Sequence, residues 1–192
     1  MAERPRNKNI REALILAGVN EIKAHGVGGF SIRQVAEACG VSCAAPYRHF
    51  KDKKEFIAAI IAYVNGQWQE RQQQVLEECG EGLREKIVAI SVDYVKFLME
   101  KPHYRAVLML KDEEFDNIYH KIRGQNSSRS QILADEYFSA AGIDGKARAR
   151  KLYVVRALIF GAVVMFDNGE MEYNDQTLEQ IRFCIDREFD LP

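Results

Sequence analysis

Apolar residues near the start of the chain recur with the spacing of an amphipathic helix. Four of them fall on one helical face, namely Leu14, Ala17, Gly18 and Ile22. Asn9 can cap this helix, and the glycines within residues 26–29 can end it because glycine tolerates positive φ. The pattern therefore predicts a first helix from about residue 9 to residue 25.

A second and shorter apolar pattern begins at Ser31. The Ser31 hydroxyl can accept a hydrogen bond from the Gln34 amide, while the Gln34 side chain reaches back to the same turn. The inward stripe of this helix consists of Ile32, Val35, Ala36 and Cys39. Gly40 then supplies a left-handed turn, and Ser42 can cap a third helix. Two short helices joined by a glycine turn predict a helix-turn-helix.

The third predicted helix, residues 43–50, has small residues at its tip and an aromatic and basic cluster behind them. Pro46 lies four residues after the Ser42 cap, where the loss of one backbone donor is tolerable. Small residues allow a helix backbone to approach base edges in the DNA major groove, and here they are Cys43, Ala44 and Ala45. The side chains that can supply phosphate donors or a base contact are Tyr47, Arg48 and His49.

The remaining two thirds of the chain predict a larger helical body. Helices are expected at about residues 53–78, 83–101, 103–110, 115–141, 144–167 and 175–189. The predicted fold class is therefore all-α. An N-terminal three-helix domain with the helix-turn-helix is expected over residues 1–52, followed by a larger helical domain over residues 53–192.

The last two long helices each carry an apolar stripe. The stripes are Leu152, Val155, Ile159, Val163 and Phe166 on the first helix, and Leu178, Ile181, Ile185 and Phe189 on the second. Two such faces can pair with those of a second copy as a four-helix bundle, which predicts a homodimer. The alternative is that both stripes are internal core.

Composition narrows the class of protein. Hydrophobic residues make up 47% of the chain, and the longest apolar run, residues 157–166, is far shorter than the roughly 20 residues that span a bilayer. No apolar segment behind the N-terminal cations is long enough for a signal peptide. The chain has four cysteines, Cys39, Cys43, Cys79 and Cys184. Their spacing is that of neither a disulfide scaffold nor a zinc finger. These features predict a compact protein of the reducing cytoplasm.

Charge is distributed unevenly along the chain. Residues 1–60 carry 10 Lys and Arg against 6 Asp and Glu, whereas the remaining residues carry 17 against 22, so a head of +4 precedes a body of −5. A basic head on an acidic body is typical of a protein whose N-terminal part binds a polyanion. Ordinary scatter of charges is the alternative.

The segment GVGGFSIRQVAEACGVSCAAPYRHFKDKKEFIAAI, residues 26–60, resembles the N-terminal signature of the TetR-type bacterial transcriptional regulators. The shared features are a glycine after the first helix, a Ser or Thr cap, a glycine-valine turn, and a Tyr-x-His-Phe followed by a Lys. The resemblance implies that DNA phosphates are contacted by Ser31, Tyr47, His49 and Lys53. It implies that bases are faced by Cys43, Ala44, Ala45 and Arg48, behind the cap residue Ser42. Pro46 stands where many members carry Leu.

The resemblance also implies a ligand-responsive regulator. Such a protein is a homodimer that binds a palindromic operator in double-stranded DNA, and residues 53–192 would be its ligand-binding and dimerisation domain. A small apolar or aromatic inducer would occupy a cavity in this body, for which we favour Trp68, Tyr94, Tyr104 and Phe138. The favoured function is a repressor that this ligand releases from its operator. A transcriptional activator and a helical protein-binding adaptor without DNA binding are the alternatives.

Enzymatic and metal chemistry have weaker support in the sequence. The zinc-protease, nucleophile-elbow and dinucleotide fingerprints are missing, so neither catalysis nor a cofactor is expected, and an all-helical enzyme is a distant alternative. Glu113, Asp116 and His120 share a helical face that can hold a divalent metal, but acidic helix surfaces are commoner, so no metal is expected. A redox role for the Cys43 thiol at a helix N-terminus is a further alternative to its role as a small residue facing DNA.

Overall fold

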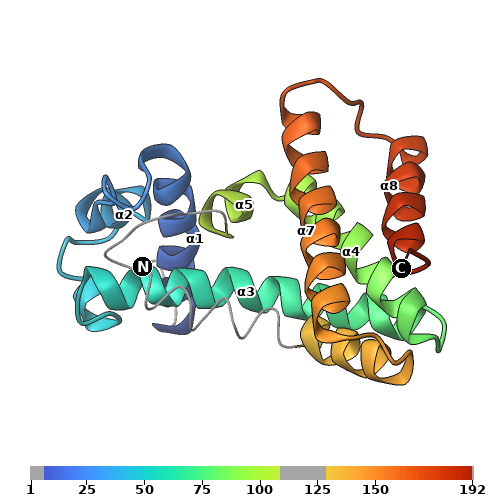
Figure 1. Ribbon diagram of the computed structural model, residues 1–192. Helices are drawn as coiled ribbons and strands as arrows, with labels where there is room; N and C mark the ends of the chain where they lie inside the picture. Colours follow the sequence, from blue (N-terminus) through green and yellow to red (C-terminus); the bar gives the residue numbers. More distant parts are fainter. Residues whose placement is uncertain (1–6, 109–128, 192) are drawn as a thin grey trace. The chain divides into compact units, whose positions relative to one another are not determined.

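The computed structural model describes residues 7–108 and 129–191 of the chain (Figure 1). Within these residues the secondary structure is helical and contains no β-strand, which confirms the all-α prediction. None of the helices in this part of the chain is both long and apolar enough to cross a membrane.

The helices follow the predicted order closely. They are α1 (Asn7–His25), α2 (Ile32–Ala38), the 3₁₀ turn η1 (Pro46–Arg48), α3 (Lys53–Glu78), α4 (Leu83–Glu100), α5 (Pro102–Leu108), a helix over residues 129–140, α7 (Gly145–Asp167) and α8 (Asp175–Glu188). α1 begins at Asn7, ahead of the expected cap at Asn9. The one described segment that departs in type from the prediction is the third helix, because η1 is a single 3₁₀ turn.

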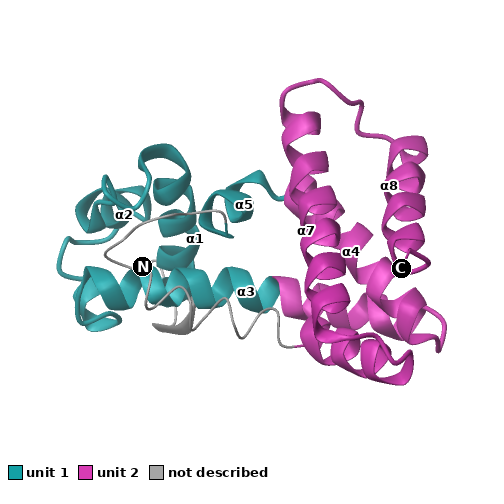
Figure 2. Cartoon of the chain, viewed as in Figure 1, with its two compact units in different colours: residues 1–67, 101–125 teal, residues 68–100, 126–192 magenta. Residues whose placement is uncertain are grey.

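The chain forms two compact units (Figure 2). Unit 1 contains residues 1–67 and 101–125, and unit 2 contains residues 68–100 and 126–192. Helix α3 therefore contributes its first part to unit 1 and its last part to unit 2. The expected boundary between residues 52 and 53 divides the predicted DNA-binding domain from the predicted ligand-binding and dimerisation domain. It is defined by function and stays a prediction.

The core of unit 1 joins α1 closely to the first part of α3. Leu14 and Ile22 of α1, which the sequence pattern places on the inward face, are buried. Gly18 lies between them, and a Cβ at this position would lie 2.5 Å from Ile60 Cδ1. Glycine therefore leaves room for the Ile60 side chain, which would have to move if a larger residue stood here.

Unit 2 is built on contacts among α4, α7 and α8. Its most deeply buried side chains include Val95 and Leu98 of α4, Val163 of α7 and Ile185 of α8, each at most 1% exposed. Burial of these branched side chains supplies the main stabilisation of the unit, at roughly 1.5 to 3 kcal/mol for each.

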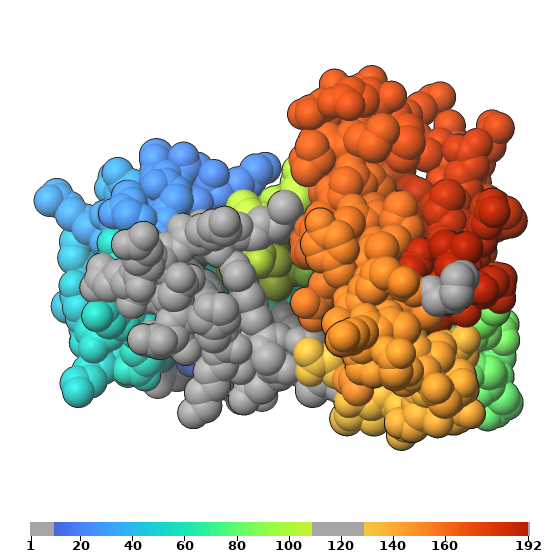
Figure 3. Space-filling model, in the orientation of Figure 1, coloured from blue at the N-terminus to red at the C-terminus, as the bar shows by residue number. Residues whose placement is uncertain are grey.

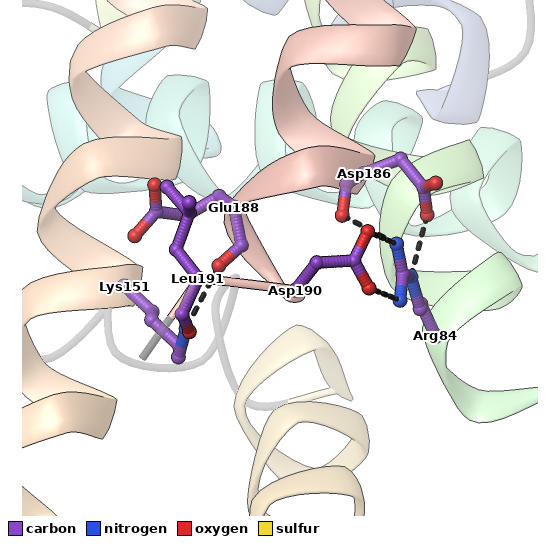
Figure 4. Close-up of polar contacts among 6 residues, drawn as sticks. All are labelled: Arg84, Lys151, Asp186, Glu188, Asp190 and Leu191. Atoms are coloured by element: carbon purple, nitrogen blue, oxygen red, sulfur yellow. Dashed lines mark hydrogen bonds and ion pairs between the residues drawn. The ribbon is translucent and has the colours of Figure 1, made fainter.

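A buried lysine holds the C-terminal end of α8 (Figure 4). Lys151 of α7 is 2% exposed, and its Nζ donates to the backbone oxygens of Glu188 and Leu191 at 2.8 and 2.5 Å. The Glu188 carbonyl is at the end of α8 and has no partner within the helix, and Leu191 is in the segment after it. Lys151 therefore supplies a donor to both carbonyls and links α7 to the end of α8.

Arg84 of α4 holds the same end of α8 through side chains. Its Nε donates to Asp186 Oδ1 at 2.7 Å, and its Nη1 donates to Asp190 Oδ1 at 2.5 Å. Hydrogen bonds to Asp190 and Asp186 raise the pKa of Arg84, and the bond from Arg84 lowers the pKa of Asp190. The end of α8 is thus fastened to both α4 and α7.

Candidate nucleic-acid interface

Helix α2 begins at an N-cap formed by Ser31, as the sequence predicts. The Ser31 Oγ accepts a hydrogen bond from the Gln34 N–H at 3.3 Å. The Ser31 N–H, however, donates to Glu21 Oε1 of α1 at 3.3 Å. The predicted bond from this N–H to the Gln34 side chain is therefore wrong, because a carboxylate of the neighbouring helix is the acceptor.

The turn after α2 depends on a glycine. Gly40 has a φ of 66°, in the left-handed region that other residues rarely adopt. Its N–H donates to Glu37 O at 2.9 Å, and the Val41 N–H donates to Ala36 O at 3.0 Å. These two bonds satisfy the last carbonyls of α2 and turn the chain sharply away from the helix.

The segment after this turn, residues 42–49, is called the tip below. Its α-helix prediction is wrong, because two turns replace the helix. Ala45 N–H donates to Ser42 O at 2.8 Å, and in η1 the Arg48 N–H donates to Ala45 O at 3.1 Å. Pro46 has no N–H to donate to the Ser42 carbonyl, which interrupts α-helical bonding. The predicted side-chain cap from Ser42 is also wrong, since Ala45 is the N-cap and η1 has no side-chain cap bond.

The tip exposes most of the residues that are expected to meet DNA. Its exposed residues are Ser42, Cys43, Ala44, Tyr47 and Arg48. Tyr47 is 59% exposed, so its hydroxyl is available as a donor to a phosphate. The other predicted contact residues are half-buried, namely Ser31, Ala45, His49 and Lys53.

Buried residues at either side of Tyr47 anchor the tip to unit 1. Pro46 is buried, and Phe50 is 2% exposed. The guanidinium carbon of Arg11 in α1 lies 5.4 Å from the centre of the Phe50 ring, which is the range of a cation–π contact. The exposed side of the tip is therefore supported by apolar residues that face the core.

Two side-chain hydrogen bonds fasten the chain between the tip and α3. The Asp52 side chain caps α3, because the Glu55 N–H donates to Asp52 Oδ1, and the Lys51 N–H donates to Glu55 Oε2, both at 2.8 Å. Lys53 Nζ donates to the backbone oxygen of Gly28 at 3.4 Å, so this side chain lies against the loop between α1 and α2. Lys51 is exposed.

Two further exposed cations are close to the motif residues along the chain. Arg33 is in the first turn of α2, and Lys51 directly follows the tip. Neither occupies a position that the motif assigns to DNA contact. The sequence hints at them only through the excess of positive charge over residues 1–60, which does not identify individual residues.

The four cysteines are free thiols. Cys39, which we expected to be buried, is half-buried, and its Sγ donates to Ala13 O at 3.5 Å. Burial raises the pKa of the Cys39 thiol. Cys43 is exposed at the tip.

The four residues expected to line a ligand cavity lie in different parts of the fold. Trp68 and Tyr94 meet in unit 2, with ring centroids 4.6 Å apart. Phe138 is also in unit 2 and packs against Phe189, with centroids 6.2 Å apart. Tyr104 belongs to unit 1. The structure thus brings Trp68 and Tyr94 into direct contact.

The two surface hollows found in unit 2 do not include these four residues. One, of about 500 Å³, lies between α4 and α8 and is lined in part by Val88 and Phe183. The other, of about 410 Å³, is lined in part by Leu76 and Ile132. The ligand-binding residues therefore stay a prediction.

The apolar stripes proposed as a dimer interface fill the core of unit 2 instead. Leu152 is half-buried. The other residues of the two stripes are each at most 8% exposed, namely Val155, Ile159, Val163, Phe166, Leu178, Ile181, Ile185 and Phe189. Helices α4, α7 and α8 cover these side chains within one chain, which is the arrangement of the alternative interpretation. The interface residues and the homodimer itself stay predictions.

The acidic and histidine group at Glu113, Asp116 and His120 lies outside the described residues. Among residues 7–108 and 129–191, no group of three His, Cys, Asp or Glu side chains is arranged to hold a metal ion.

The geometry of α1, α2 and the tip defines a helix-turn-helix protein of the DNA-binding class. Residues 14–60 match the family described as bacterial regulatory proteins, tetR family. The N-terminal helix-turn-helix region is therefore of the TetR type, the DNA-binding part of a family of transcriptional regulators. No curated protein sequence matches it.

Solved structures share the fold along nearly the whole chain. A TetR family transcription regulator from Marinobacter aquaeolei VT8 has a TM-score of 0.78 at 22% identity, covering 95% of this chain and 96% of that one. The regulator FadR from Bacillus subtilis, solved in complex with stearoyl-CoA, has a TM-score of 0.73 at 17% identity, covering 92% and 95%. The fatty acid degradation regulator FadR from Bacillus halodurans has a TM-score of 0.72 at 15% identity, covering 96% of each chain.

Proposed function

We propose that this protein is a transcriptional repressor, which binds a palindromic operator as a homodimer and is released by a small apolar or aromatic ligand. The observation that carries the DNA-binding part is the exposure of Tyr47 beside Arg48 on a tip whose neighbours Pro46 and Phe50 are buried. A basic and aromatic surface with rigid support suits contact with a charged polymer. Binding to bacterial DNA would place the protein in the cytoplasm.

The tip would approach the major groove through its small residues. Cys43 and Ala44 are exposed and short, so they leave room for the backbone to come close to base edges. Arg48 can bind a guanine or a phosphate, and Tyr47 can donate to a phosphate. Lys53 would exchange its 3.4 Å contact with the Gly28 carbonyl for a charge-assisted bond to a phosphate.

The exposed face of α7 is the surface that a second copy would use. It carries Tyr153, Phe160 and Val164, which are 73, 38 and 46% exposed. Side chains of α7 form a continuous stretch of the visible surface, in orange, in the space-filling view (Figure 3). The N-terminal half of this helix adds the exposed Arg150, and its C-terminal end adds the exposed Asp167.

This distribution of charge favours antiparallel pairing of α7 with its copy. In such a pair, the basic half of one helix lies beside the acidic end of the other, and the aromatic and aliphatic side chains meet between them. Two tips could then reach successive major-groove faces about 34 to 36 Å apart. Phe160→Glu should place two charges in this interface and shift the protein to a monomer in analytical ultracentrifugation, whereas Ile132→Glu, at an exposed site of the helix over residues 129–140, should not.

The proposed ligand is apolar in part, with an acyl chain as the first candidate. Trp68 contacts both Tyr94 and Phe97 in unit 2, and these rings form an aromatic cluster within its core. The structurally similar FadR from Bacillus subtilis was solved with stearoyl-CoA, which makes acyl-CoA thioesters and fatty acids suitable first probes.

One selection experiment tests the proposal. Duplexes that bind the full-length protein are selected from a random pool, and the consensus is examined for two-fold symmetry. The same complex is then exposed to acyl-CoA thioesters of increasing chain length. A palindromic consensus and release by ligand support the proposal. A reporter placed behind the selected sequence distinguishes repression from activation, and a failure to select any sequence would favour a protein-binding adaptor.

A further inference from the structure

The carboxylate of Glu21 in α1 collects donors from the start of α2. Its Oε1 accepts from the Ser31 N–H at 3.3 Å. When the Gln34 amide is oriented so that its nitrogen faces an acceptor, that nitrogen lies 2.6 Å from Oε1 and 3.3 Å from Oε2 of Glu21. His25 Nε2 lies 3.9 Å from Oε2. The Glu21 side chain is only 11% exposed, so it is enclosed by the groups that it binds.

This arrangement ties the start of α2 to α1. An isolated capping box would satisfy Ser31 and Gln34 by each other, and α2 would then carry its own N-terminal bonds. Here only half of that box exists, because Gln34 N–H donates to Ser31 Oγ while Glu21 takes the Ser31 N–H. The placement of α2 therefore depends on a side chain of another helix.

A carboxylate is the group that suits this position. It only accepts hydrogen bonds, and bonds from neutral donors to a charged acceptor are stronger than those to a neutral one. It also lies near the N-terminus of a helix, where negative charge is favoured. Glutamine in its place would keep the shape but would have one oxygen and one donor nitrogen facing the Ser31 and Gln34 donors.

We infer that Glu21 is a positioning residue for DNA recognition, which aligns α2 and the tip that follows it. This inference rests on the proposed binding of DNA by the tip. α2 carries Ser31 and Arg33 in or before its first turn and leads through Gly40 directly into the tip. A change in the direction of α2 at Ser31 therefore moves the contact residues at both of its ends.

Coulomb's law alone predicts the opposite effect of removing this charge. A carboxylate near a DNA-binding surface repels phosphates, so Glu21→Gln would strengthen DNA binding if Glu21 had no positioning role. If Glu21 positions α2, the same substitution weakens binding to the specific site although it removes a repulsive charge. The sign of the change therefore separates the two explanations.

The test compares Glu21→Gln with Glu12→Gln in the full-length protein. Glu12 is an exposed residue of α1, so this control removes the same charge from the same helix. The affinity of each variant is measured for the duplex that the parent protein selects and for a scrambled duplex of equal length, and both values are corrected for the folded fraction. Exchange of the Ser31 amide hydrogen is followed by NMR without DNA.

We expect Glu21→Gln to lower the ratio of specific to scrambled affinity about tenfold, which is the scale of one lost charge-assisted hydrogen bond. Exchange of the Ser31 amide should accelerate, and Glu12→Gln should leave both quantities near the parent values. An unchanged or higher ratio in Glu21→Gln would overturn the inference. If Glu21→Gln does not fold, Glu21→Asp replaces it as the test, because it keeps the charge on a side chain that is one methylene shorter. Glu21→Asp should lower the ratio of specific to scrambled affinity. An unchanged ratio would again overturn the inference. If the parent protein prefers no duplex, the proposed function is refuted. The bond between α1 and α2 is tested separately, by the NMR measurement.

Discussion

The rings of Phe50 and Phe56 are stacked, with centroids 4.0 Å apart and planes 6° from parallel. Phe50 directly follows the tip, and Phe56 is in the first turns of α3. Phe56 also meets Phe30, which precedes α2, edge-on at 5.4 Å. The aromatic group thus connects both ends of the helix-turn-helix to α3.

Substitution of Phe56 should remove this support. Phe56→Ala deletes a side chain that is 0% exposed and leaves a cavity between Phe30 and Phe50. We expect the free energy of unfolding to fall by about 3 to 5 kcal/mol, measured by urea denaturation. Tyr47→Ala, at the exposed tip, should change it by less than about 0.5 kcal/mol. Equal losses in both variants would show that the stacked rings are not part of the stabilising core.

Lys53 should contribute one phosphate contact to DNA binding. Lys53→Ala should weaken binding to all duplexes and reduce the slope of log K against log salt by about 1.8 for the proposed homodimer, because each of the two copies releases one fewer counterion. The slope is measured by fluorescence anisotropy between low and moderate salt. Lys146→Ala, at an exposed position of α7 in unit 2, should keep the slope of the parent. If the two variants have the same slope, Lys53 does not contact a phosphate.

Arg48 should contribute to the choice of base. Its exposure on the tip allows it to reach a guanine edge, where a bidentate contact is worth about 1 to 3 kcal/mol. Selection from random DNA with Arg48→Ala should therefore return a consensus that has relaxed at one position of each half-site. A consensus identical to that of the parent would remove Arg48 from base recognition.

Lys151 should stabilise unit 2 through the end of α8. Lys151→Met has a similar length but no donor, so the carbonyls of Glu188 and Leu191 lose their partner. We expect a loss of about 2 kcal/mol in the free energy of unfolding, which is the cost of leaving buried acceptors unsatisfied. Lys146→Met, at an exposed site of the same helix, serves as the control and should be nearly neutral. A stabilised Lys151→Met would mean that desolvation of the ammonium outweighs its two bonds.

Tyr104 should make stability sensitive to alkaline pH. Burial raises the pKa of Tyr104 from 10.0 to about 12, and a hydrogen bond with Tyr63 adds to the shift. Between these values the unfolded chain loses the phenolic proton while the folded chain keeps it, so stability falls as the pH rises from 10 toward 12. Tyr104→Phe should lose less stability over this interval in thermal unfolding. Tyr153→Phe, at a site that is 73% exposed, should follow the parent.

Local patterns predicted the parts of the fold that depend on neighbours in the chain. The bounds of α3 agree with the apolar periodicity, and Gly40 adopts the left-handed conformation that its place after α2 suggests. The tip is different, because the absent N–H of Pro46 changes hydrogen bonding across the whole segment and converts a predicted helix into turns. The site residues themselves came from a motif in which spacing and residue type agree at many positions.

The amino-acid sequence by itself determined the order of helices, the helix-turn-helix and the likeness of the N-terminal region to TetR-type regulators, because these follow from periodicity, capping and a contiguous motif. Only the tertiary structure decided that the stripes through Ile159 and Ile185 are covered within one chain, since periodicity shows which face is apolar and not what covers it. It also decided that Glu21 holds the start of α2 and that Lys151 closes the end of α8. These bonds join residues of different helices, and the distances between such residues exist only once the helices have packed.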